Sequence, residues 1–335
     1  MCIRDSVVGD DTPNLVVTLN QGDGSGGDGP YVETYEPWSA TVDNAWETVD
    51  LAPFGVPANA VVEVAVINSN TGKERQGGVR AVGSTLERRF DLHEGEAGGV
   101  DAVTLHVQAD ASGRIQHYAE KKAEVSFVLL GYWTEASYVE LFAPFSATAA
   151  NSWISEGVAD EGLGPNQIAE VVMQNINGGA ERLAGVRATG SSINRRFDLH
   201  EAEGGGVDAV SLMVATDAAS TIEAYAENTS DVVFYVVGFW STPPGTWTEL
   251  GGTSARSTPT AAWGVKNVAS LGVPASSVTQ FVITNDTIGA ENTAGARSVG
   301  SSQDRFVDLQ EAEAGGSDLV TMHAHVDTNT DVEWY

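Results

Sequence analysis

Hydrophobic and polar residues alternate with a period of two in short segments along most of the chain. In the first third, the sets Val62–Val64–Val66, Val103–Leu105–Val107 and Val125–Phe127–Leu129 all follow this pattern. Such alternation is typical of half-buried β-strands, and no segment keeps a 3.6-residue period over the length of a helix. We therefore predict strands at about 45–51, 60–68, 77–83, 87–93, 102–109, 114–119 and 124–133.

Turn-forming sequences separate these segments: NSNTG at 68–72, GEAGG at 95–99 and DASG at 110–113. Short strands at regular spacing predict an all-β fold built from antiparallel sandwiches. The pattern alone leaves a jelly-roll and an immunoglobulin-like topology open.

The whole pattern occurs three times. Arg187 follows Arg80 by 107 residues, and Arg297 follows Arg187 by 110. A period this long predicts autonomous domains rather than solenoid units. We predict one sandwich in each of 31–133, 134–241 and 242–335, with the C-terminal strand missing from the third. Residues 1–30 are expected to comprise a leader of artificial origin (MCIRDS) and a flexible linker.

Several short motifs recur with the repeat, namely a VRxxGS turn, a DAVxLxV strand, an IxxYAE segment and a closing VxFxxxGYW or VxFxxxGFW strand. The chain resembles the tandem β-sandwich repeats of secreted and surface proteins of bacteria, which often close on a VxGYF-like strand. That resemblance implies an extracellular, accessory or adhesive role, and it brings no catalytic residues with it.

The charge limits the possible partners. The chain has 46 Asp and Glu against 17 Lys and Arg, a net charge of −29. This excess of negative charge disfavours nucleic acid and anionic lipid as partners. Cys2 is the one cysteine, so the repeats hold neither a disulfide nor a thiolate metal site. No apolar run approaches the ~20 residues of a membrane span, so no membrane insertion is expected.

An acidic loop in each copy is the main candidate for ion binding. Calcium takes six to eight oxygen ligands in irregular geometry, which carboxylates around a Gly-Gly turn can supply. The alternative is a solvated hairpin that keeps a sheet edge from pairing. The candidate ligands are Asp91, Glu94, Glu96 and Asp101; Asp198, Glu201, Glu203 and Asp208; and Asp308, Glu311, Glu313 and Asp318. No other cofactor is expected.

Two histidines, His93 and His200, lie in this loop, but the third copy has Gln310 there. A transition-metal site needs two or more His or Cys ligands, so surface imidazoles are expected.

A recurring arginine precedes the first aspartate of the loop by eleven residues, as Arg80, Arg187 and Arg297. This spacing predicts a cross-strand ion pair with Asp91, Asp198 and Asp308, to which Arg88, Arg195 and Arg305 could add. The alternative is an arginine that binds an anionic sugar or a carboxylate ligand.

Aromatic residues favour a carbohydrate ligand or a packing role. Trp46, Trp153 and Trp263 recur on an early strand, where a core position is the first expectation. Trp133 and Trp240 end the closing strand, where they either seal a joint between domains or face a ligand.

No constellation indicates catalysis. Ser84, Ser191 and Ser301 lie in R-x-x-G-S turns without a nucleophile elbow or a recurring histidine base. The sequence therefore predicts a non-catalytic, extracellular or cell-surface region whose sandwiches form a rod and act in structure or adhesion. The alternative is an array of carbohydrate-binding modules attached to a hydrolase, with a polysaccharide or another cell-surface ligand as partner.

Overall fold

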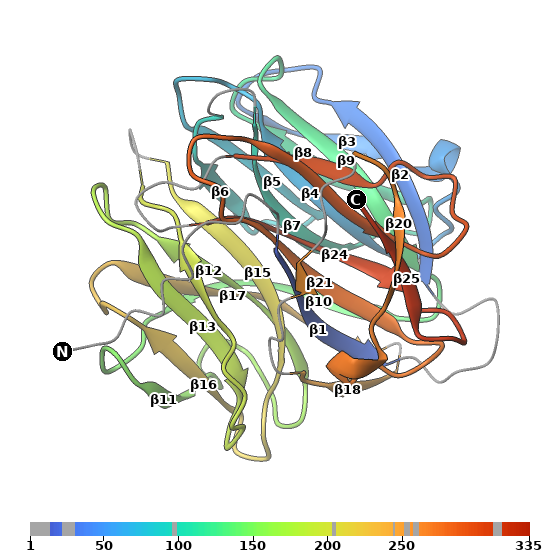
Figure 1. Cartoon of the computed structure of the whole chain (residues 1–335). Coiled ribbons are helices and arrows are strands. Elements are labelled where there is room, and N and C mark those ends of the chain that lie inside the picture. Colours follow the sequence, from blue (N-terminus) through green and yellow to red (C-terminus); the bar gives the residue numbers. More distant parts are fainter. Residues whose placement is uncertain are drawn as a thin grey trace.

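A computed structural model confirms an all-β chain of antiparallel sheets (Figure 1). The structure describes residues 14–21, 31–95, 99–202, 206–243, 245–250, 255–256, 261–310 and 317–335. Three two-sheet units, here called copies one to three, share one strand order. Each has an inner sheet, which faces the other copies, and an outer sheet.

Copy one contains the strands that the alternation predicts, with one more strand ahead of them. Its inner sheet has the order β2 (Tyr31–Ser39), β9 (Val125–Trp133), β4 (Val61–Asn68) and β7 (Asp101–Gln108). Its outer sheet has the order β3 (Ala45–Asp50), β8 (Arg114–Ala119), β5 (Arg75–Ala81) and β6 (Arg89–Leu92). The short 3₁₀ helix η1 (Ala52–Phe54) follows β3.

Copy two repeats this plan. Its inner sheet has the order β10 (Ser137–Phe145), β17 (Val232–Thr242), β12 (Ile168–Asn175) and β15 (Asp208–Ala215). Its outer sheet has the order β11 (Trp153–Gly157), β16 (Thr221–Ala226), β13 (Arg182–Ala188) and β14 (Arg196–Leu199).

Copy three takes its second inner strand from the opposite end of the chain. Its inner sheet has the order β18 (Thr246–Thr248), β1 (Asn14–Gln21), β21 (Val278–Asn285) and β24 (Asp318–His325), and β19 (Ala255–Arg256) also pairs with β1. Its outer sheet has the order β20 (Gly264–Asn267), β25 (Asp331–Trp334), β22 (Asn292–Arg297) and β23 (Phe306–Leu309), with η2 (Ala269–Leu271) after β20.

The assignment of residues 14–21 to a linker region was therefore wrong. β1 pairs antiparallel with β21 from Asn14↔Thr284 to Asn20↔Val278, the place that β9 and β17 hold in the other copies. The unpaired edge of β21 offers a row of backbone donors and acceptors, and the VVTL segment supplies a strand of suitable length.

The three copies close into a ring, so the expected rod was also wrong. The strands β7, β15 and β24 pack against one another around a pseudo-threefold line that we call the central axis (Figure 1). Single backbone bridges join the copies in cyclic order: Leu92↔Val207, Leu199↔Ser317 and Leu309↔Val100.

Ring closure explains why the inner strands are buried on both faces. All eight residues of β4, β12 and β21 are buried. One face of each inner sheet covers its own outer sheet, and the other packs on the next copy; Val172 and Ala209, for example, join the core of copy one. Strands covered on both sides carry mainly apolar residues on both faces, as in VVEVAVIN.

Among the residues that the structure describes, no helix is long and apolar enough to cross a membrane.

Candidate functional site: a polar central axis and three aromatic rows

Three aspartates meet at one level of the central axis. Asp101, Asp208 and Asp318 begin β7, β15 and β24, and each is at most 4% exposed. One carboxylate oxygen of each lies within 4.8 Å of the others. In all three copies, the Oδ2 atom accepts a hydrogen bond from the backbone amide eight residues earlier, at 2.6–2.8 Å. We call this group the aspartate triad.

The triad is electrostatically strained. Burial raises the pKa of all three carboxyl groups, and repulsion between the carboxylates raises the pKa of Asp101 and Asp208 further. For Asp318, burial outweighs its backbone hydrogen bonds and raises the pKa to about 7. Three buried carboxylates therefore require shared protons or a bound cation.

This arrangement changes the acidic-loop prediction, which placed a separate four-residue site in each copy. Asp91, Asp198 and Asp308 lie on the outer-sheet strands β6, β14 and β23, whereas the second aspartate of each loop lies at the axis. Glu94 and Glu201 are partly exposed. The remaining candidates, Glu96, Glu203, Glu311 and Glu313, lie outside the described residues. Calcium binding stays a prediction, and the described residues gather only the triad for it.

The expectation of surface imidazoles was wrong for His93 and His200. Both are buried, 2% and 5% exposed, and their ring centroids lie 5.3 Å apart. Gln310 holds the third equivalent position, and its Nε2 donates to the Glu94 carbonyl at 2.7 Å. The loops that carry these residues run inward because each bridges to the next copy at Leu92, Leu199 or Leu309.

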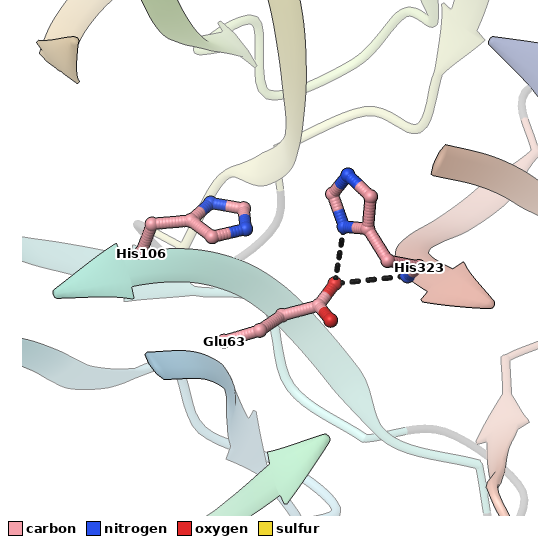
Figure 2. Close-up of side chains that lie close together, drawn as sticks. All are labelled: Glu63, His106 and His323. Atoms are coloured by element: carbon pink, nitrogen blue, oxygen red, sulfur yellow. Dashed lines mark hydrogen bonds and ion pairs between the residues drawn. The ribbon is translucent and has the colours of Figure 1, made fainter. Parts of the chain in front are cut away.

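A second polar layer lies further along the same three strands. His106 on β7 and His323 on β24 each direct Nδ1 to a glutamate of the following copy. Figure 2 shows this contact for His323 and Glu63. The distances are 3.0 Å from His106 Nδ1 to Glu170 Oε1 and 2.9 Å from His323 Nδ1 to Glu63 Oε1. Burial opposes ionisation of Glu63, but the two imidazoles and Arg305 outweigh it and lower its pKa to about 2. We call this group the histidine layer.

Two tyrosines complete the hydrogen bonding of these glutamates. Tyr31 donates to Glu63 Oε2 and Tyr138 to Glu170 Oε2, each at 2.5 Å. A side chain at Gly131 or Gly238 would collide with the tyrosine ring, which explains the glycine of the closing VxFxxxGYW or VxFxxxGFW motif.

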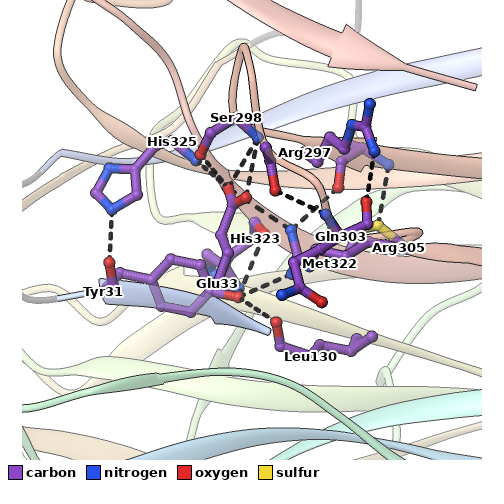
Figure 3. Close-up of polar contacts among 12 residues, drawn as sticks. Tyr31, Glu33, Leu130, Arg297, Ser298, Gln303, Arg305, Met322, His323 and His325 are labelled. Atoms are coloured by element: carbon purple, nitrogen blue, oxygen red, sulfur yellow. Dashed lines mark hydrogen bonds and ion pairs between the residues drawn. The ribbon is translucent and has the colours of Figure 1, made fainter. Parts of the chain in front are cut away.

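Buried arginines join the copies. Arg88, Arg195 and Arg305 are at most 1% exposed, and each faces a glutamate of the next copy. Two of these glutamates lie on the first inner strand of that copy, and the third follows that strand. The shortest N–O distances are 3.0 Å for Arg88–Glu140, 3.2 Å for Arg195–Glu249 and 3.7 Å for Arg305–Glu33. Glu33 also accepts hydrogen bonds from Ser298 and from the His325 amide (Figure 3).

Trp133 and Trp240 close this end of the axis. They are 0% and 2% exposed, and their ring centroids lie 5.0 Å apart. Neither indole presents a face to solvent, so the ligand-facing alternative was wrong and the packing alternative describes them. They lie here because β9 and β17, which carry them, belong to the inner sheets, and these sheets face the axis.

The predicted pairing of Arg80, Arg187 and Arg297 with the loop aspartates was wrong. In the β5–β6 ladder, Asp91 lies opposite Gln76, and Arg80 lies four residues further along, opposite Gln116 of β8. The arginine Nε therefore donates across the other edge of the strand. Its partners are Gln116 at 3.0 Å, Glu223 at 2.6 Å and Glu333 at 2.7 Å.

These arginines belong instead to a group repeated on the outward face of each outer sheet, in which the tryptophan is partly exposed and Tyr118 and Tyr225 are buried. The arginine Cζ lies 4.0–4.2 Å from the ring centroid of Trp46, Trp153 or Trp263. Each tryptophan is only partly buried, and its ring centroid lies 5.5–5.7 Å from that of a neighbouring tyrosine. We call these groups the aromatic rows. Their members are Trp46, Arg80, Arg89 and Tyr118; Trp153, Arg187, Arg196 and Tyr225; and Trp263, Arg297, Phe306 and Tyr335.

The rows point away from the core because of strand alternation. In β3, Val49 packs on the core of copy one, so Trp46, three residues earlier, lies on the opposite face. The expected core position of this tryptophan was therefore wrong. A glycine makes room for the ring: a Cβ atom at Gly185 would lie 2.8 Å from the Trp153 side chain.

The glutamates, the axial histidines and the role of Arg88, Arg195 and Arg305 were not recognised from the sequence. One signal was present, because Glu63 and Glu170 are lone charged residues at equivalent positions within apolar strands. A lone buried charge requires a partner.

Comparisons with known proteins assign no family. No protein-family model matches the chain, and no curated protein matches it. Among solved structures, the N-terminal CBM22-1–CBM22-2 tandem domain of Paenibacillus barcinonensis Xyn10C is similar at 10% identity and a TM-score of 0.16. That match covers 70% of this chain and 99% of the other. At this TM-score the likeness carries no argument about function.

Proposed function

We propose that this chain is a non-catalytic, trivalent binding module of a secreted or cell-surface protein, and that each aromatic row binds carbohydrate. One observation carries the proposal: a solvent-facing tryptophan with a stacked arginine and a neighbouring aromatic ring recurs in all three copies. The row lies outside the core that holds each copy together.

The chemistry of the rows suits a sugar ligand. Aromatic rings offer apolar surface to the C–H face of a sugar, and the guanidinium and carboxylate groups beside them can hydrogen-bond to hydroxyl groups.

Ring closure supports adhesion through avidity. Three equivalent rows on one rigid body can engage a repetitive polysaccharide at once, which multiplies weak single-site affinities.

The test is a broad glycan array probed with the full chain, followed by calorimetry on the glycans that bind. We expect three sites per chain in the wild type and two in Trp153→Ala, with at least a ten-fold weaker apparent affinity for an immobilised polysaccharide. Ile288→Ala is the matched control, since Ile288 is 74% exposed and lies outside the rows. Absence of glycan binding, or unchanged stoichiometry in a folded Trp153→Ala variant, would refute the proposal.

A further inference from the structure

The histidine layer has three equivalent positions around the central axis, and two of them carry an imidazole. His106 on β7 and His323 on β24 hold two, and Met213 on β15 holds the third. The ring centroids of His106 and His323 lie 5.4 Å apart. Met213 is fully buried in the same cluster as Trp133 and Trp240, whose indoles flank the imidazoles.

Each imidazole has a hydrogen-bond partner at only one of its two ring nitrogens. Nδ1 is engaged by a carboxylate, at 3.0 Å in His106 and 2.9 Å in His323. The Nε2 atoms of both rings are buried and have no hydrogen-bond partner among the described residues. Figure 2 shows the His106 ring directed toward His323 and Glu63. Two unpartnered buried nitrogens are costly unless a further group satisfies them.

The cluster is compact enough for one ion: one ligand atom from each of His106, His323 and Glu63 lies within 4.8 Å of the others. A metal ion held between the rings would take the lone pairs that no hydrogen bond uses.

The surrounding charges also favour a cation. At the interface of copies one and two, Arg88 faces both Glu140 and Glu170. At the interface of copies three and one, Arg305 faces both Glu33 and Glu63. Each of these two interfaces thus places two glutamates around one arginine. The interface of copies two and three differs. Gln280 stands at the position that Glu63 and Glu170 hold in the other copies, and Met213 stands at the position of the histidines. Arg195 therefore faces Glu249 without a second glutamate.

We propose that His106 and His323 bind one late first-row transition-metal ion, copper or zinc, through Nε2, with Met213 as the third ligand. Glu170 and Glu63 orient the rings and fix the proton on Nδ1, as carboxylates do behind metal-bound histidines. Two imidazoles suit both metals, while a thioether favours Cu⁺. The indoles of Trp133 and Trp240 keep water from the site.

The experiment uses the full chain, stripped with a chelator and reloaded anaerobically with Cu⁺ or Zn²⁺. Metal content is measured after desalting, together with the unfolding temperature. We expect one equivalent of metal and a raised unfolding temperature in the wild type, and loss of both in His106→Gln and His323→Gln. His117→Gln is the matched control, because His117 is buried but packs within copy one rather than at the axis.

A second pair of variants tests the third ligand and distinguishes the metals. Met213→Leu should weaken Cu⁺ binding at least ten-fold and remove sulfur from the copper X-ray absorption spectrum. Met213→His should strengthen Zn²⁺ binding by completing a ring of three imidazoles. Failure of the folded wild type to retain either metal would overturn the proposal, as would equal loading of His106→Gln. Should the histidine variants not fold, an unchanged Zn²⁺ affinity in Met213→His would likewise overturn it.

Discussion

At the scale of residues, the axis places titratable groups where water cannot reach them. Among the residues that the structure describes, no arginine or lysine lies beside Asp101, Asp208 or Asp318, whereas Glu63 and Glu170 have an imidazole and a guanidinium. Carboxyl groups therefore behave in opposite ways at two levels of one axis: burial raises the pKa of the triad, and the histidine and arginine partners lower that of the glutamates.

The triad should make stability fall as the pH rises. Because the native pKa is raised above the unfolded value, the native state binds more protons from about pH 4 to about pH 7, and the stabilisation is lost across that window. We expect Asp318→Asn to gain stability relative to the wild type between pH 5 and pH 8, by roughly 1–3 kcal/mol at ~1.4 kcal/mol per pKa unit. Urea unfolding in the presence of a chelator measures the difference.

Asp110→Asn is the control with the opposite sign. Its hydrogen bonds with Arg114 lower the pKa of Asp110, so this substitution should cost more at high pH than at low pH. A pH-independent effect of Asp318→Asn would contradict the electrostatic account of the triad. Calcium added at pH 8 tests the calcium prediction, which requires a stabilisation of the wild type that Asp318→Asn lacks.

At the scale of elements, β1 completes a sheet to which it is remote in sequence. Its ladder with β21 covers seven residue pairs and replaces the strand that copies one and two supply from their own C-terminal ends. An exposed β21 edge would also invite pairing between molecules.

Deletion of residues 1–30 should therefore destabilise copy three and promote association. At ~1 kcal/mol per net backbone hydrogen bond, we expect a loss of about 3 kcal/mol or more in the free energy of unfolding. Deletion of residues 1–13 leaves β1 in place and is the control. Chemical unfolding and light scattering provide the measurements, and equal stability of the two deletions would show that β1 is dispensable.

At the scale of the whole molecule, buried ion pairs between copies close the ring. Arg88, Arg195 and Arg305 lie inside one copy while their glutamates come from the next, so each pair exists only in the assembled ring. The ring is thus one cooperative body, in contrast to a string of independent sandwiches.

Glu140→Ala should strongly destabilise this body. Removing one partner of a buried pair leaves the other charge uncompensated and costs about 3–5 kcal/mol. Asp43→Asn removes an exposed pair with Lys121 and should cost much less, because solvent screens exposed pairs. Thermal unfolding measures both, and we expect a single transition in each case. A Glu140→Ala loss no larger than that of Asp43→Asn would argue against ring closure through these pairs.

The sequence by itself determined most of the strands, their antiparallel pairing and the threefold repetition, but neither β1 nor β2. Val62, Val64 and Val66 share one face of β4 because pleated strands send neighbouring side chains to opposite faces, a local property that one segment can reveal. Glycines and turn residues marked the ends of strands for the same local reason.

Only the tertiary structure decided what the recurring polar residues do. Asp101, Asp208 and Asp318 are too far apart in the chain for spacing to relate them, and the partners of His106 and Arg88 lie in another copy. The positions of the outward tryptophans and the inward histidines were both predicted wrongly. The sequence of one copy does not show which face of each sheet stays in contact with water. Closing the ring removes the inner face from water, and burial then fixes which charges must meet.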